Sequence, residues 1–110
     1  MEKLDPDDKR FLSAKTADPD GSPVLELRGE LDMVSAVTLR ETVEGLVAEN
    51  NCEHVVFDLT NLQFMDSSGI AVLVFAANKI NRIELRHASP IIRRIIEVTG
   101  LSSFLRLDPQ

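Results

Sequence analysis

The 110-residue sequence contains one cysteine, no tryptophan, no tyrosine and five phenylalanines. With a single thiol, Cys52, the chain cannot form an internal disulfide or a cysteine-based zinc site. We interpret Cys52 as a bystander thiol, with a redox role as the alternative. The scarcity of aromatic residues predicts an aliphatic core. The longest apolar run covers only residues 70–77, whereas a helix that spans a bilayer needs about 20 apolar residues.

A basic surface is also missing, because 18 acidic residues outnumber 12 lysines and arginines and give a net charge of −6. Nucleic-acid binders need positive charge to neutralise phosphates, so we expect no direct nucleic-acid binding and no docking on anionic membranes. His54 and His87 fall at expected strand positions without ligand spacing, so no metal site and no cofactor is predicted. The N-terminus lacks the apolar core of a signal peptide, which predicts a cytoplasmic protein.

Apolar residues make up 44% of the chain, enough for the core of one domain. We expect this domain at residues 10–107, after a flexible charged N-terminus (1–9) and before a short tail (108–110). Alternating apolar residues predict strands, and apolar residues at helical spacing predict helices between them. The expected strands are residues 10–16, 24–29, 55–59, 83–88 and 104–107, and the expected helices are residues 36–47, 67–79 and 90–99.

The predicted fold class is α/β, a mixed sheet of about four to five strands with helices packed against it. Turn-forming residues 17–22 predict a hairpin, so the N-terminal strand is expected to be antiparallel to the next. The nearly continuous apolar run 55–59 is typical of a central strand covered on both faces. Ser35 and Ser89 are the expected N-caps of the first and last helices, and Gly100 is expected to cap the end of the last.

Residues 64–70, with the sequence FMDSSGI, carry the most information about function. They lie between a buried strand and an apolar helix, at the edge of an α/β sheet where ligands and partners dock. The hydroxyl of Ser67 is expected at the N-terminus of this helix, where unpaired N–H groups and the helix dipole can accommodate a phosphate. Gly69 lacks a side chain, which would let a kinase or a partner backbone approach closely.

The same residues also fit simpler interpretations. A Ser-Ser-Gly sequence before an apolar helix can be an N-cap with a spare hydroxyl. Asp66 beside Ser67 suggests a nucleophile, but no histidine is placed by spacing to activate it. The Gly-x-Ser-x-Gly motif of hydrolases and the Gly-x-x-x-x-Gly-Lys phosphate loop are both absent. We therefore do not expect an enzyme.

Several segments together resemble the STAS domain, and in particular the bacterial anti-sigma factor antagonists. They are GELD at 29–32, VVFDL at 55–59, FMDSSGI at 64–70, Ser89-Pro90 and TGL at 99–101. The resemblance covers residues 10–107. It rests on the order and spacing of the segments, since no single four-residue piece is specific.

The resemblance implies a phosphoprotein that acts by partner switching. In that cycle the unphosphorylated antagonist binds an anti-sigma factor that is also an ATP-dependent serine kinase, which frees the sigma factor for transcription. The kinase then phosphorylates the first serine of the motif, here Ser67, and a PP2C-type phosphatase resets the protein. Asp32 is expected beside Ser67 on the partner-binding surface, together with Asp66, Ser68 and Gly69, which shape the loop.

A second function stays open at this point. STAS domains also act as scaffolds in stress-signalling assemblies or as small-ligand modules, in which Ser67 is never phosphorylated. A ligand would then occupy a pocket under the apolar helix 67–79. A homodimer is a further open alternative for the oligomeric state.

Overall fold

The computed structural model of the chain describes residues 12–50, 53–100 and 106–107. Along these residues the elements are β1 (Leu12–Ala17), β2 (Pro23–Leu31), α1 (Met33–Asn50), β3 (His54–Met65), α2 (Ser67–Lys79), β4 (Arg82–Arg86), α3 (Pro90–Val98) and β5 (Arg106–Leu107). The α/β class predicted from the sequence is confirmed. The predictions for residues 1–11, Cys52, 104–105 and 108–110 lie outside the described residues.

The strands form one sheet in the spatial order β1-β2-β3-β4-β5. β1 pairs antiparallel with β2, and the other neighbours pair in parallel. β3 pairs with β2 as far as Met65 but with β4 only over residues 54–58. Leu31 and Met65, the last residues of β2 and β3, are register partners, so the loops that follow both strands begin side by side.

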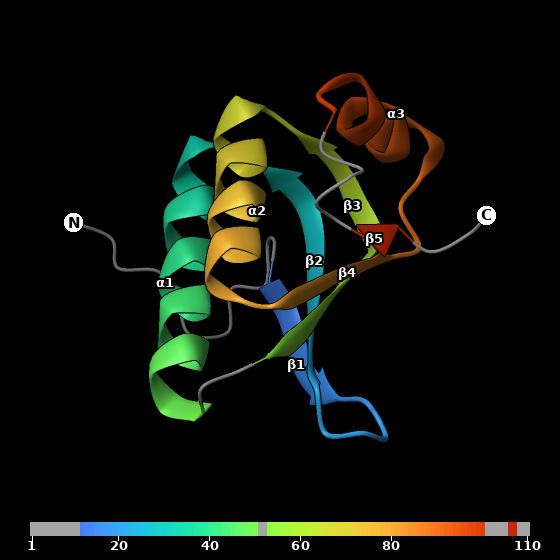
Figure 1. Cartoon of the computed structure of the whole chain (residues 1–110). Helices are drawn as coiled ribbons and strands as arrows, with labels where there is room; N and C mark the ends of the chain where they lie inside the picture. The colour runs from blue at the N-terminus through green and yellow to red at the C-terminus, as the bar shows by residue number, and fades with distance from the viewer. Residues whose placement is uncertain (1–11, 51–52, 101–105, 108–110) are drawn as a thin grey trace.

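The helices α1 and α2 lie side by side and run in the same direction, each returning from the carboxyl end of a parallel strand (Figure 1). In this view β2 and β3 lie between these two helices and α3, which packs against β3. The main core joins α1 and α2 to alternate residues of the strands, among which Leu25, Leu27, Val55, Phe57 and Leu59 are fully buried.

The strand β3 is covered on both faces near its middle. Val55, Val56 and Phe57 are each 0% exposed, although successive side chains of a strand point to opposite faces. Val56 is the one of these three that stays outside the main core cluster. The prediction that the apolar run 55–59 forms a central strand covered on both faces is therefore confirmed.

Several boundaries differ from the prediction or refine it. The helix α1 begins at Met33 rather than after Ser35, and β3 continues to Met65 instead of ending near residue 59. The strand β4 ends at Arg86, and His87 leaves the strand in the left-handed region with φ 62°. No helix in the described part of the chain is both long and apolar enough to span a membrane.

The expected caps of α3 are confirmed. The Ser89 hydroxyl accepts a hydrogen bond from the Ile92 N–H at 3.3 Å, and Pro90 is the first helical residue. At the other end Gly100 has φ 78° and its N–H donates to the Glu97 carbonyl. The helix therefore ends at Gly100, as the sequence predicted.

Candidate functional site

Asp32 stands between β2 and α1 and caps the helix. Its Oδ1 accepts hydrogen bonds from the N–H groups of Val34 and Ser35 at 3.1 and 3.0 Å. The Ser35 hydroxyl reaches back and accepts from the Asp32 N–H at 2.9 Å. The prediction that Ser35 is the N-cap is therefore wrong, because the aspartate carboxylate takes the free N–H groups and Ser35 completes a reciprocal pair. The N–H and hydroxyl of Ser35 lower the pKa of Asp32 below its ordinary value.

Asp66 plays the same part between β3 and α2. Its Oδ1 accepts from the N–H groups of Ser68 at 2.8 Å and Gly69 at 3.3 Å. Its own N–H donates to the Leu31 carbonyl at 3.1 Å, which ties the start of α2 to the end of β2. Parallel neighbours in a sheet are about 4.8 Å apart. The two aspartates therefore begin their helices side by side at one edge of the sheet.

Ser67 is the first residue of α2 and its side chain is exposed. Among the described residues, no hydrogen bond involves its hydroxyl. Phe64, three residues earlier, is 45% exposed at the same edge. The serine is therefore sterically accessible to a second protein and is not held by the fold.

Gly69 is buried, and its missing side chain makes room for the chain itself. A Cβ at this position would lie 2.8 Å from Leu31 Cγ and 2.9 Å from the Leu31 carbonyl oxygen. The sequence suggested that this glycine admits a kinase or a partner backbone. In the structure the close approach is made by β2, so Gly69 sets how near α2 lies to the sheet.

The helix N-terminus is also less open to a phosphate than the sequence suggested. Two of its N–H groups, from Ser68 and Gly69, already donate to the Asp66 carboxylate. A phosphate on Ser67 would therefore meet a carboxylate that occupies the cap, with Asp32 on the adjacent loop. Repulsion from these two carboxylates would therefore oppose the attraction of the helix dipole for a phosphate.

All five residues expected at the site, Asp32, Asp66, Ser67, Ser68 and Gly69, thus gather at the carboxyl ends of β2 and β3. The site offers an exposed hydroxyl beside the capping carboxylates of Asp32 and Asp66. His54 begins β3, at the end of the strand far from Asp66, and His87 follows β4. The structure thus brings the exposed Ser67 and both capping aspartates to one edge of the sheet.

The comparisons agree with this geometry. The family model described as "STAS domain" matches residues 13–110. The chain belongs to the STAS domain family. Among its relatives, an "Anti-sigma F factor antagonist" from Paenibacillus polymyxa is 33% identical over 85 residues, which cover 74% of this chain and 73% of that protein.

Two solved structures show the similarity in fold. The crystal structure of an anti-sigma factor antagonist from Mycobacterium paratuberculosis has a TM-score of 0.76 and 30% identity, covering 88% of this chain and 86% of that one. The Bacillus cell fate determinant SpoIIAA in its phosphorylated form has a TM-score of 0.65 and 21% identity, covering 88% of this chain and 93% of that one. At 21% identity, the similarity to SpoIIAA shows a shared fold alone.

The described part of this STAS domain holds no group of three or more His, Cys, Asp or Glu residues that could bind a metal ion. A shallow pocket lies away from the core side of α2, where the interior is filled by Val72, Leu73 and Ala76. Its lining comes from the C-terminal halves of β2 and β3 and from the residue before α3. The lining residues are Arg28, Gly29, Thr60, Asn61, Leu62, Gln63 and Ser89. The alternative from the sequence, a ligand pocket under the apolar helix, stays a prediction.

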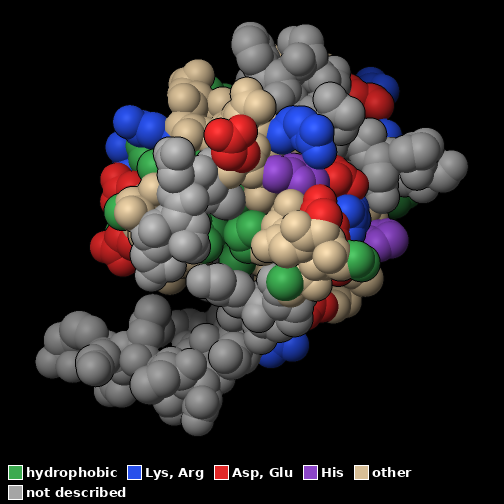
Figure 2. All heavy atoms as spheres, turned by 60° about the horizontal axis from the view of Figure 1, so that its bottom comes forward, with side chains coloured by type: hydrophobic (Ala, Val, Ile, Leu, Met, Phe, Trp, Pro, Cys, Tyr) green, Lys and Arg blue, Asp and Glu red, His purple; other side chains and the backbone are tan. Residues whose placement is uncertain are grey.

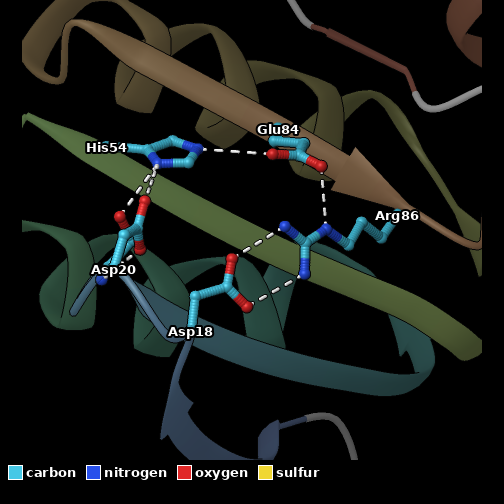
Figure 3. Close-up of polar contacts among 6 residues, drawn as sticks. Asp18, Asp20, His54, Glu84 and Arg86 are labelled. Carbon is cyan, nitrogen blue, oxygen red and sulfur yellow. Dashed lines mark hydrogen bonds and ion pairs between the residues drawn. The ribbon is translucent and has the colours of Figure 1, made fainter.

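A second polar cluster, which the sequence did not indicate, lies at the opposite end of this STAS domain. Arg86 on β4 makes a bidentate ion pair with Asp18 of the hairpin, at 2.7 and 3.0 Å, and its Nε contacts Glu84 at 2.8 Å. Glu84 in turn lies 3.3 Å from Nε2 of His54, whose Nδ1 is 3.9 Å from Asp20 (Figure 3). Figure 2, which brings this end forward, shows acidic, basic and histidine side chains close together on the surface.

This cluster holds the β1–β2 hairpin against β3 and β4. The hydrogen bond from Arg86 and its positive charge lower the pKa of Glu84, and the bonds to Asp18 and Glu84 raise the pKa of Arg86. Asp18 and Arg86 are 68 residues apart, so no sequence spacing could have paired them. The cluster is structural and lies at the far end of β3 from Ser67.

Proposed function

We propose that this chain is an anti-sigma factor antagonist whose binding is switched by phosphorylation of Ser67. The unphosphorylated form binds an anti-sigma factor that is also a serine kinase, and it thereby releases a sigma factor for transcription. Phosphorylation by that kinase ends the complex, and a PP2C-type phosphatase restores the binding form. The proposal describes a regulator, in keeping with the names of its relatives.

One observation carries the proposal: Ser67 is exposed at the first position of α2, between two capping carboxylates, with no described hydrogen bond to its hydroxyl. A kinase can therefore reach the hydroxyl without breaking a contact of the fold. The caps of α1 and α2 do not depend on Ser67, so its modification is expected to leave both helices in place.

The electrostatics supply the switch. A phosphate adds about −1.5 to −2 charges at neutral pH. Beside Asp32 and Asp66 this charge raises repulsion and the cost of removing water when a partner covers the edge. A loss of affinity of about 3 kcal/mol corresponds to about a hundredfold, since each 1.4 kcal/mol is tenfold. No rearrangement of the fold is needed.

The decisive experiment is intact-mass analysis after incubation with ATP and anti-sigma kinases from the same genome. We expect one phosphate on the wild type and on Ser68→Ala, and none on Ser67→Ala. Ser68 is the matched control, because it is the adjacent hydroxyl but is half-buried.

Binding is measured on the same proteins. Ser67→Ala is expected to stay permanently competent to bind, and Ser67→Glu is expected to bind more weakly, although one carboxylate mimics a dianion poorly. A phosphate on Ser68 instead, or no phosphate with any such kinase, would refute the switch. Loss of binding in a folded Ser67→Ala would show that the hydroxyl is itself a contact.

A further inference from the structure

Three large apolar side chains are exposed on the first two turns of α1. Met33 and Val34 are each 70% exposed, and Val37 is 57% exposed. They are separate from the buried stripe of this helix, which consists of Ala36, Leu39, Val43 and Leu46. We call Met33, Val34 and Val37 the α1 strip. Apolar side chains that gather on a surface without a structural reason mark an interaction site.

The α1 strip and Ser67 lie at the same end of the neighbouring helices α1 and α2. The Cζ of Arg40 lies 4.1 Å from the centre of the Phe75 ring, and this contact marks a point at which α1 and α2 are adjacent. At a rise of about 1.5 Å per residue, Met33 lies about 10 Å before Arg40 along α1, and Ser67 lies about 12 Å before Phe75 along α2. Met33 and Val37 share a side of α1 with Arg40, because positions i, i+4 and i+7 lie on one face. The strip and Ser67 therefore stand at the same level on neighbouring parallel helices.

Acidic residues edge the α1 strip. Asp32 immediately precedes it, and Glu41 and Glu44 are exposed on the following turns of α1. The Nε of Arg40 lies 3.7 Å from Glu44 and its guanidinium covers the Phe75 ring. Arg40 and Glu44 therefore offset each other, and the acidic edge rests on Asp32 and Glu41. An apolar strip edged by carboxylates is complementary to an apolar surface edged by lysine or arginine. A second copy of this acidic chain would bring like charges together instead.

We propose that the α1 strip determines which anti-sigma factor is bound, and that the partner covers it with apolar side chains edged by lysine or arginine. The inference rests on the proposed function and extends its interface from the Ser67 loop to α1. Apolar side chains at the centre of an interface carry much of the affinity, whereas charges at the edge set the association rate and orientation. Phosphorylation of Ser67 then places a strongly hydrated group at the border of an apolar contact.

The test compares two pairs of exposed apolar side chains in the full chain. Met33→Gln with Val37→Gln removes most of the strip. Ile91→Gln with Val98→Gln is the matched control on α3, where these side chains are 55% and 67% exposed. Glutamine is a good helix former, and urea unfolding verifies that both double variants are folded. The partner is a kinase that binds the wild type and binds Ser67→Glu more weakly.

We expect the strip variant to bind at least about tenfold more weakly in titration calorimetry, and the α3 variant to match the wild type. Higher salt is expected to slow association, because it screens the acidic edge. Unchanged affinity of the strip variant would overturn this proposal, while the effect of Ser67→Glu leaves the proposed function standing. If no anti-sigma kinase binds the wild type, both are wrong. A wild-type dimer that the strip variant turns into a monomer would assign the strip to a second copy and overturn the proposal.

Discussion

Replacing Gly69 by alanine tests how the site is built, because the new methyl group has no space. Its Cβ would lie 2.8 Å from Leu31 Cγ, 3.0 Å from Cδ2 and 2.9 Å from the carbonyl oxygen. Carbon atoms in contact are normally about 3.5–4.0 Å apart. The Leu31 side chain can turn, but its carbonyl is part of β2 and accepts the Asp66 N–H. The start of α2 must therefore move away from the sheet.

The expected cost follows from two opposing effects. Overpacking a tight contact costs about 1–3 kcal/mol. Alanine in place of glycine inside a helix contributes about 0.5–1 kcal/mol of stability. We therefore expect Gly69→Ala to lower the free energy of unfolding by about 1–2 kcal/mol. For a domain of about this size each kcal/mol lowers Tm by about 4–8 °C, so the expected fall in Tm is about 4–16 °C.

Gly45 on α1 provides a matched control for the same substitution. It is exposed in the middle of a helix, and a Cβ there would meet no atom within 4 Å. Gly45→Ala should therefore stabilise the protein by about 0.5–1 kcal/mol. Urea unfolding of both variants gives the comparison, since the midpoint shifts at constant slope report stability. If Gly69→Ala were as stable as the wild type, the close contact between α2 and β2 would be wrong.

Three further predictions follow from the capping and the polar cluster. Asp66→Ala should lower the free energy of unfolding by about 1 kcal/mol, because two N–H groups of α2 lose their acceptor, and an unchanged urea midpoint would contradict this cap. Arg86→Met should speed hydrogen exchange of the Gly21 amide, which donates to the Asp18 carbonyl in the hairpin, and equal exchange would show that the ion pairs do not hold the turn. Because the pKa of Glu84 is lowered in the folded state, its carboxylate stabilises the fold above the unfolded-state pKa of about 4.3. That contribution is lost as the pH falls through the folded pKa, so Glu84→Gln should flatten the acid side of the stability profile, and parallel profiles would contradict the assignment.

The elements themselves were predictable, and their ends depended on tertiary structure. Periodicity located α1, but Met33 and Val34 are apolar and exposed, so the first turn does not follow the amphipathic pattern. Polar residues such as Thr60 and Asn61 hid the second half of β3. That half forms because β2 provides a partner, with irregular register between Gly29 and Glu30.

The site was predictable in its location and less so in its construction. The resemblance to the STAS domain implied that Asp32 lies near Ser67, and the paired carboxyl ends of β2 and β3 bring the two residues to one edge. The role of Gly69 was missed, since the distance from a helix to Leu31 has no signature in local sequence. The same holds for Asp18 and Arg86, which meet only after the hairpin has packed over the sheet.

The unequal pairing of β3 has a mechanical consequence for signalling. Residues 54–58 are held on both sides, but among the described strands residues 59–65 have only β2 beside them, with α3 packed against β3. The second half of β3 is therefore paired on one side only, and α3 supports it from one face. Ser67 stands just past its free end, so the stiffness of the docking edge depends on α3, which is distant from the serine motif in sequence. Substitution of the buried α3 residues Ile92 and Ile96 is therefore expected to loosen this edge, whereas substitution of the exposed Ile91 and Val98 is expected to leave it unchanged.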